Sequence, residues 1–326
     1  MPPDYARAET AVAPPAKPLR HRPLIDPASE AFGLFCGCVL ALGASTAFAF
    51  ARAGILAGLS PADLVLARFT VSAVLLLPLL WRWGLRSLAG IGWPRALVLL
   101  ALGGPAFALM QSGGYVFAPL AHGGVIHPAS VTILSTLMAA AFLRERLTRA
   151  HIGGAVVVLL GIVLISWHGL TAGASSRSWI GDLLFFLSAV LWAGFTVMIR
   201  AWKLPAIRAV GVTALLSALV TLPGYLAWYG VAHLAALPPR QVLIQALAQG
   251  VVQGAVAITA YAHSIRVLGV SRAVLFPASV PAVSVLLGIF IVGEVPNPVQ
   301  VAGLLLVTTG LGLAIGLFRR TGPRLR

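Results

Sequence analysis

The sequence has few charged residues. Asp, Glu, Lys and Arg make up 10% of its 326 positions, whereas hydrophobic residues make up 59%. A soluble globular domain carries about 25% charged residues, so a water-soluble fold does not account for this composition. Apolar runs of about 20 residues recur along nearly the whole chain, and each is long enough to cross a ~30 Å hydrocarbon layer as a helix. The sequence therefore predicts an all-α integral membrane protein.

Cysteines, buried carboxylates and nucleotide-binding motifs are also scarce. The two cysteines, Cys36 and Cys38, would point about 200° apart on a helix, which favours packing thiols over a disulfide or a metal site. No G-x-x-x-x-G-K-[ST] segment occurs, which excludes ATP drive through a P-loop in this chain. No carboxylate falls deep inside an apolar run, which argues against proton coupling through Asp or Glu. We therefore expect neither a cofactor nor a resident metal.

Ten membrane spans are predicted from the apolar runs and from residues typical of helix starts. Ser60-Pro61 and Asn297-Pro298 each place a capping side chain before a proline at the first helical position. The predicted spans cover residues 32–51, 62–81, 96–118, 124–143, 150–167, 181–200, 207–229, 242–265, 272–293 and 297–318.

Lysine and arginine are unevenly distributed between the loops. If the N-terminus is cytoplasmic, the inner segments hold 19 of the 23 basic residues and the outer segments hold only Arg52, Arg177 and Arg240. This distribution meets the positive-inside rule and predicts a multi-pass protein of the cytoplasmic (inner) membrane with both termini cytoplasmic. The anionic headgroups of the lipid bilayer explain the basic excess, so we expect no nucleic-acid partner.

An internal repeat divides the chain into two halves. The run Pro128-Ala129-Ser130-Val131 recurs 149 residues later as Pro277-Ala278-Ser279-Val280. The same offset relates three further pairs: Glu145 and Glu294, Gly154 and Gly303, and Gly161 and Gly310. Because five spans is an odd number, the second half enters the membrane from the opposite side, so the halves are inverted repeats. This architecture places a binding site near the midplane and exposes it alternately to each side.

The predicted organisation follows from the spans and the repeat. It comprises a disordered cytoplasmic tail (1–30), a first five-helix repeat (31–168), an outer linker (169–180), a second five-helix repeat (181–318) and a basic cytoplasmic tail (319–326).

Residues around the ninth span resemble a known family. The run 269–273 leads into Pro281, and Gly293-Glu294 follows with the glutamate thirteen residues after that proline. This arrangement resembles the EamA-type transporters of the drug/metabolite transporter superfamily, and residues 121–132 and 144–148 hold the matching place in the first half. The resemblance covers roughly residues 31–318. It implies a ten-span carrier, of a kind that often exports amino acids, metabolites or drugs.

Arg68 is the only charge deep in a predicted span. It lies about eight residues beyond Ser60, or ~12 Å into the membrane. Inserting it costs on the order of 2.5–3.5 kcal/mol, so it should face the bundle interior. It could be the counter-charge for a substrate carboxylate, or a structural anchor bonded to backbone carbonyls or toward Asp63. The family resemblance favours the anchor.

Polar and aromatic side chains at mid-span depth are candidates for substrate binding. Gln111 and Tyr115 share a face of the third span, Trp192 lies in the sixth span and Gln253 in the eighth. His127, in the fourth span, is a further candidate because a titrating imidazole could couple protons to transport. Packing or hydrogen bonding between helices is the competing interpretation for each of these residues.

Prolines and glutamates near span ends suggest local helix irregularities. Pro128, Pro277 and Pro281 are expected to bend the fourth and ninth spans, and bent helices are where transporters build sites. Glu145 and Glu294 are expected to satisfy backbone groups at the start of the next helix.

Two functions are compatible with these features. The first is a secondary transporter that moves a small organic solute, an amino acid or related metabolite, outward by alternating access. The alternative is an integral-membrane enzyme acting on lipid or a lipid-linked group. An enzyme would need convergent catalytic residues, and the sequence has no H-E-x-x-H, no paired intramembrane carboxylates and no Ser/His/Asp set at one depth. We therefore expect a non-enzymatic carrier of a small-molecule substrate, and the Gly312/Gly316 pair permits a homodimer through the last span.

Overall fold

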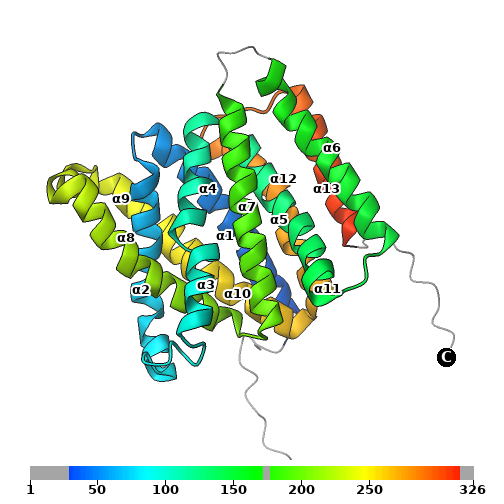
Figure 1. Ribbon diagram of the computed structural model, residues 1–326. Coiled ribbons are helices and arrows are strands. Elements are labelled where there is room, and N and C mark those ends of the chain that lie inside the picture. The colour runs from blue at the N-terminus through cyan, green and yellow to red at the C-terminus, as the bar shows by residue number, and fades with distance from the viewer. Residues whose placement is uncertain (1–28, 172–176, 316–326) are drawn as a thin grey trace, which may run out of the picture.

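The computed structural model describes residues 29–171 and 177–315, which form a bundle of helices with no strand in these ranges (Figure 1). In chain order the helices are α1 (Glu30–Leu56), α2 (Pro61–Trp83), α3 (Trp93–Gly103), α4 (Pro105–Phe117), α5 (Leu120–Leu143), α6 (Arg149–Thr171), α7 (Ser178–Ala201), α8 (Ala206–Ala236), α9 (Pro239–Gln245), η1 (Ala246–Val256), α10 (Ala257–Leu268), α11 (Val270–Ala273), α12 (Leu275–Ile291) and α13 (Pro298–Ala314). The predicted basic tail (319–326), all but the last two residues of the predicted N-terminal tail and residues 172–176 of the predicted linker lie outside the described residues.

Every predicted span coincides with helix over most of the residues that the structure describes. Eight helical segments are long and apolar enough to cross a membrane, and α12 and α13 are shorter apolar helices. The third span is divided at Gly104, because Pro105 begins a new helix there. The eighth span runs from α9 through the π-helical η1 into α10. The protein is thus an all-α, multi-pass membrane protein.

The helix starts predicted from sequence are confirmed at α2 and α13. The Ser60 hydroxyl accepts from the backbone N–H of Asp63, and the Asp63 carboxylate accepts from the N–H of Ser60. Asn297 and Gln300 form the same reciprocal capping box at α13. Each box satisfies two backbone donors that the first turn of a helix leaves free.

The three prolines occupy different helical environments. Pro128 lies inside α5 and removes the partner of the Gly124 carbonyl, which instead accepts from the Ser284 hydroxyl of α12 at 3.1 Å. Pro281 lies inside α12. Pro277 lies in the first turn of α12, where a missing N–H costs little. The break in the ninth span therefore lies at Val274, between α11 and α12.

Helices from the two halves pair with one another. The most extensive pairs include α6 with α13, α5 with α7, α1 with α10, α2 with α8, and α1 with α12. Ion pairs join α1 to the ninth span at both ends, Glu30 with Arg272 of α11 and Arg52 with Glu294 just after α12. Ion pairs also join both ends of α5 and α7, namely His122–Asp182 and Glu145–Arg200. Both helix pairs are therefore parallel.

The two parallel pairs run in opposite directions through the bundle. Glu294, at the end of the ninth span, also accepts from the backbone N–H of Leu120 at the start of α5. The fourth span therefore begins on the side where the first span ends, as the inverted repeat requires. We call the face at which α1 begins the N-terminal face and the other the distal face. The predicted topology makes the N-terminal face cytoplasmic.

The glycines of the repeat lie where α6 crosses α13, side by side at one edge of the bundle (Figure 1). A Cβ on Gly154 would lie 2.6 Å from the carbonyl oxygen of Gly310, and one on Gly161 would lie 2.8 Å from that of Gly303. Only glycine permits this approach. The repeat relates Gly154 to Gly303 and Gly310 to Gly161, so it converts one of these two contacts into the other. A pseudo-two-fold axis therefore passes between the two helices.

The two glutamates of the repeat do not have the role expected from sequence. The start of α13 is capped by its own capping box, and Glu294 instead binds Arg52 and the first N–H of α5. Glu145 pairs with Arg200 of α7 rather than with the start of α6. The expectation that each glutamate caps the next helix is therefore wrong, because long-range partners take up both carboxylates.

Candidate functional site

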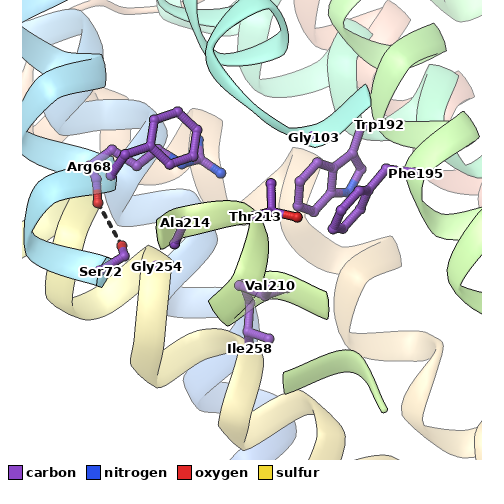
Figure 2. Close-up of a pocket in the computed structure, with 11 residues that line it drawn as sticks. Arg68, Ser72, Gly103, Trp192, Phe195, Val210, Thr213, Ala214, Gly254 and Ile258 are labelled. Carbon is purple, nitrogen blue, oxygen red and sulfur yellow. Dashed lines mark hydrogen bonds between the residues drawn. The ribbon is translucent and has the colours of Figure 1, made fainter. Parts of the chain in front are cut away.

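A pocket lies between the two halves of the bundle (Figure 2). It is lined by α2 and α3 from the first half and by α7, α8, η1 and α10 from the second. The lining residues with chemical character are Arg68, Ser72, Trp192, Phe195 and Thr213. Thr213 lies near the start of α8 and Phe195 near the end of α7, so the pocket is nearer the N-terminal face.

Arg68 places a buried positive charge at the pocket. Its side chain is 8% exposed, and one guanidinium N–H donates to the side-chain carbonyl of Gln111 at 3.1 Å. The guanidinium also lies 5.2 Å from the ring centre of Phe107, a cation–π distance. Among the residues that the structure describes, Arg68 has no carboxylate partner. A buried cation without an anion is costly, so a ligand carboxylate would be stabilising here.

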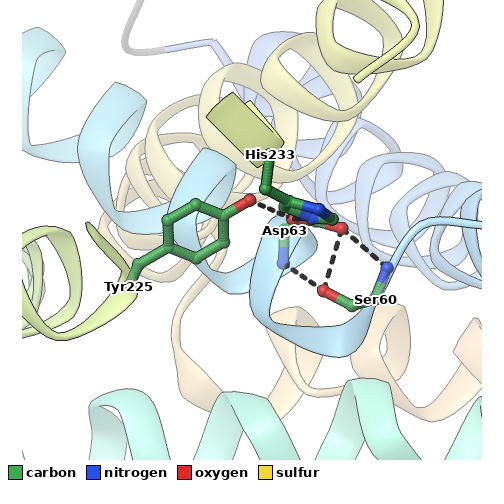
Figure 3. A network of polar contacts seen from close by, with 4 residues as sticks. All are labelled: Ser60, Asp63, Tyr225 and His233. Atoms are coloured by element: carbon green, nitrogen blue, oxygen red, sulfur yellow. Dashed lines mark hydrogen bonds and ion pairs between the residues drawn. The ribbon is translucent and has the colours of Figure 1, made fainter. Parts of the chain in front are cut away.

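The expected link between Arg68 and Asp63 is absent. The Asp63 carboxylate accepts from the N–H and hydroxyl of Ser60, at 2.7 Å and 2.8 Å, and from the Tyr225 hydroxyl (Figure 3). It also lies 3.5 Å from the imidazole of His233. Asp63 therefore stabilises the distal end of α2 and its contact with α8, and this part of the anchor interpretation is wrong.

Phe107 of α4 connects the candidate residues and was missed by sequence analysis. Its ring is 1% exposed and lies 4.8 Å from Trp192, 5.8 Å from His127 and 5.2 Å from the Arg68 guanidinium, measured between ring centres or to the guanidinium carbon. It stands one helical turn before Gln111, on the same face of α4. That spacing is the only signal that could have indicated it.

An aromatic wall and a free hydroxyl complete the pocket. Trp192 stacks between Phe107 and Phe195, with ring centres 4.8 Å apart in both cases. The Thr213 hydroxyl is buried and has no hydrogen-bond partner within the described residues. In Figure 2 it points toward Trp192. A bound solute would therefore meet a flat apolar surface, a guanidinium and an unused hydroxyl.

The remaining candidates lie beside the pocket or away from it. His127 is buried, shares a 2.8 Å hydrogen bond with Ser188, and lies against Phe107 rather than in the pocket lining. Gln253 is half-buried next to Gly254, which lines the pocket, and its side-chain carbonyl has no partner within the described ranges. Tyr115 is fully buried one turn beyond Gln111, with its ring against Phe185. The structure thus brings Arg68, Gln111, His127 and Trp192 together, and their roles stay predictions.

An inverted-repeat helical bundle with a charged and aromatic pocket between its halves is the architecture of a membrane transporter. Residues 31–167 and 179–316 each match the EamA-like transporter family, and the chain belongs to this family. Over 289 residues it is 27% identical to the "Probable terminal-alkyne amino-acid exporter" of Streptantibioticus cattleyicolor, which covers 86% of this chain and 92% of the relative. A solved crystal structure shares the fold with a TM-score of 0.61 at 22% identity, over 90% of this chain and all of the matched one.

Proposed function

We propose that this protein is a secondary transporter that exports an amino acid or a related small metabolite across the cytoplasmic membrane by alternating access. The observation that carries the proposal is Arg68, a buried guanidinium at a pocket between the halves with no carboxylate partner within the described residues. The carboxylate of an amino acid supplies the missing anion through a charge-assisted hydrogen bond.

The rest of the pocket supports a solute with an apolar side chain. Trp192 and Phe195 provide an aromatic surface, and the unpartnered Thr213 hydroxyl provides one further hydrogen-bonding group. The name of the Streptantibioticus relative supports amino acids as the class and export as the direction.

Counterflow in proteoliposomes tests the proposal. Vesicles containing the purified protein are loaded with one unlabelled amino acid at a time and diluted into a trace of the same labelled compound. We expect transient accumulation of label for at least one amino acid, and loss of that accumulation in Arg68→Gln. Arg240→Gln is the matched control, because Arg240 is exposed in the first turn of α9 at the distal face. A folded protein that gives no counterflow with any amino acid would contradict the proposed substrate class.

The same vesicles test the enzymatic alternative. Mass spectrometry of their lipids should show the same species with and without the protein. A new lipid species that appears with the wild-type protein but not with Arg68→Gln would favour an enzyme acting on lipid over a transporter.

A further inference from the structure

Two ion pairs of the bundle are repeat mates at opposite faces. Glu145 and Glu294 are 149 residues apart, and Arg52 and Arg200 are 148 residues apart. Arg52 binds Glu294 at 2.7 Å at the distal face, and Arg200 binds Glu145 at 2.5 Å at the N-terminal face. Each pair joins the first span of one half to the end of the fourth span of the other half.

The two ion pairs differ in their surroundings. The Arg52 and Glu294 side chains are 15% and 24% exposed. Arg52 also donates to the backbone carbonyl of Tyr115 at 2.5 Å, and Glu294 also accepts from the N–H of Leu120 at 2.6 Å. This distal network therefore ties α1 and α12 to the junction between α4 and α5. Because α5 pairs with α7, the network holds the two parallel helix pairs together at the distal face.

The equivalent contacts are missing at the N-terminal face. The repeat offset carries Tyr115 to Ser264 and Leu120 to Gly269. The Gly269 N–H donates to the Ile265 carbonyl of its own helix instead of to Glu145. Arg200 and Glu145 are 52% and 49% exposed and bind only each other within the described ranges. Within the described residues, this kind of network therefore joins the two parallel helix pairs at the distal face and has no equivalent at the N-terminal face, which is the side nearer the pocket.

We propose that the two networks are alternate latches of the transport cycle. The distal latch, formed by Arg52 and Glu294 with the Tyr115 carbonyl and the Leu120 amide, closes the distal face in the described state. In the other state Arg200 and Glu145 form the N-terminal latch with the Ser264 carbonyl and the Gly269 amide. Inverted repeats reach the second state by exchanging the conformations of their halves, so each latch exists in one state only. This inference rests on the proposed transport function.

The two latches shift the equilibrium between the two transport states in opposite directions. Removing contacts made only in one state shifts the population toward the other state. Glu294→Gln should therefore favour the state open to the distal face, whereas Glu145→Gln should favour the state open to the N-terminal face. A purely structural role for these glutamates predicts no such opposition.

Accessibility of a cysteine in the pocket measures this shift without a substrate. Thr213→Cys, in a background of Cys36→Ala and Cys38→Ala, is treated with a membrane-impermeant maleimide added to one face at a time. We expect Glu294→Gln to raise the rate of labelling from the distal face about tenfold, as loss of charge-assisted hydrogen bonds in one state allows. Glu145→Gln should lower the same rate. The matched control is Glu30→Gln, because the exposed Glu30–Arg272 pair has no further bonded partner within the described residues and should leave the rate unchanged.

Both possible failures are informative. If both glutamate variants change distal labelling in the same direction, or neither changes it, the latch proposal is overturned. If Glu294→Gln does not insert, Arg52→Lys carries the test, because it keeps the charge but cannot bind Glu294 and the Tyr115 carbonyl together as a guanidinium does. Opposite shifts in labelling without amino-acid counterflow would leave the latches standing and remove the proposed substrate. Amino-acid counterflow combined with labelling shifts in the same direction would support the proposed substrate and overturn the latch proposal.

Discussion

The Arg68 guanidinium donates to the side-chain carbonyl of Gln111 across 3.1 Å and joins α2 to α4 at the pocket. An amide oxygen accepts a hydrogen bond but does not neutralise a charge. Gln111 therefore orients the guanidinium and leaves its charge available to a ligand. This arrangement separates the two roles considered for Arg68, because an anchor stabilises the empty protein whereas a counter-charge stabilises the complex.

The thermal stability of Arg68→Gln distinguishes these roles. No carboxylate is left unpaired within the described residues when the guanidinium is removed, so we expect the melting temperature in detergent to change little while counterflow is lost. Asp63→Asn is the comparison, because Asp63 accepts bonds from both Ser60 and Tyr225. Asp63→Asn should lower the melting temperature, because the loss of these hydrogen bonds costs about 1–3 kcal/mol of stability. A large loss of stability in Arg68→Gln would instead identify an anchor.

Trp192 should control the apparent affinity for the solute. Trp192→Ala removes the ring that stacks on Phe107 and Phe195, and aromatic contacts of this kind contribute ~0.5–1.5 kcal/mol beyond their buried area. We expect the KM of transport to rise about tenfold, with a smaller rise in Trp192→Phe. Initial rates over a range of solute concentrations give the value. Trp228→Ala is the control, because Trp228 is 85% exposed, and an equal effect there would remove Trp192 from the site.

The spans and the repeat could be predicted from sequence because their signals are local. Hydropathy identified the helices, and the Ser60 and Asn297 caps are read from adjacent residues. The glutamate that recurs as Glu145 and Glu294 correctly marked equivalent positions. Its partners could not be predicted, because Arg52 meets Glu294 only through the folded arrangement of the halves.

The pocket was only partly predictable for a related reason. Gln111 and Tyr115 share a helical face, but one turn of α4 carries Tyr115 out of the pocket toward the distal face, where its ring packs on Phe185. Phe107 is one apolar residue among many in the sequence, and only tertiary packing places it between Arg68 and Trp192. Helical spacing predicts which residues share a face and gives no measure of depth along the pathway.

The crossing of α6 and α13 should be intolerant of even one methyl group. Gly161→Ala would place its Cβ 2.8 Å from the Gly303 carbonyl oxygen and 2.9 Å from the backbone nitrogen of Val307. We expect a loss of about 1–3 kcal/mol, seen as a lower melting temperature in detergent. Gly153→Ala, on the same helix with open space around its Cβ, should have no such cost. Equal melting temperatures for the two variants would mean that these helices are not tightly packed.

Reporter fusions should place the two termini on the same side of the membrane. Nineteen of the 23 basic residues fall in the segments that the ten-span topology makes cytoplasmic. We expect a cytoplasm-active reporter to signal from the C-terminus, and a periplasm-active reporter to signal from the 169–180 segment. Identical signals from the two sites would be incompatible with ten spans.

Single cysteines test which of the candidate residues line the pathway. In a background of Cys36→Ala and Cys38→Ala, Thr213→Cys and Trp192→Cys should react with small water-soluble thiol reagents, because both side chains line the pocket. Gln253→Cys should react if its unpartnered carbonyl faces water in the transport cycle. Tyr115→Cys should stay unreactive, because its ring is fully buried against Phe185. Substrate should slow the labelling of pocket positions alone, since only there does it compete with the reagent for space. Reaction at Tyr115→Cys with substrate protection would extend the pathway to the distal face, and protection at none of these positions would place the binding site elsewhere in the bundle.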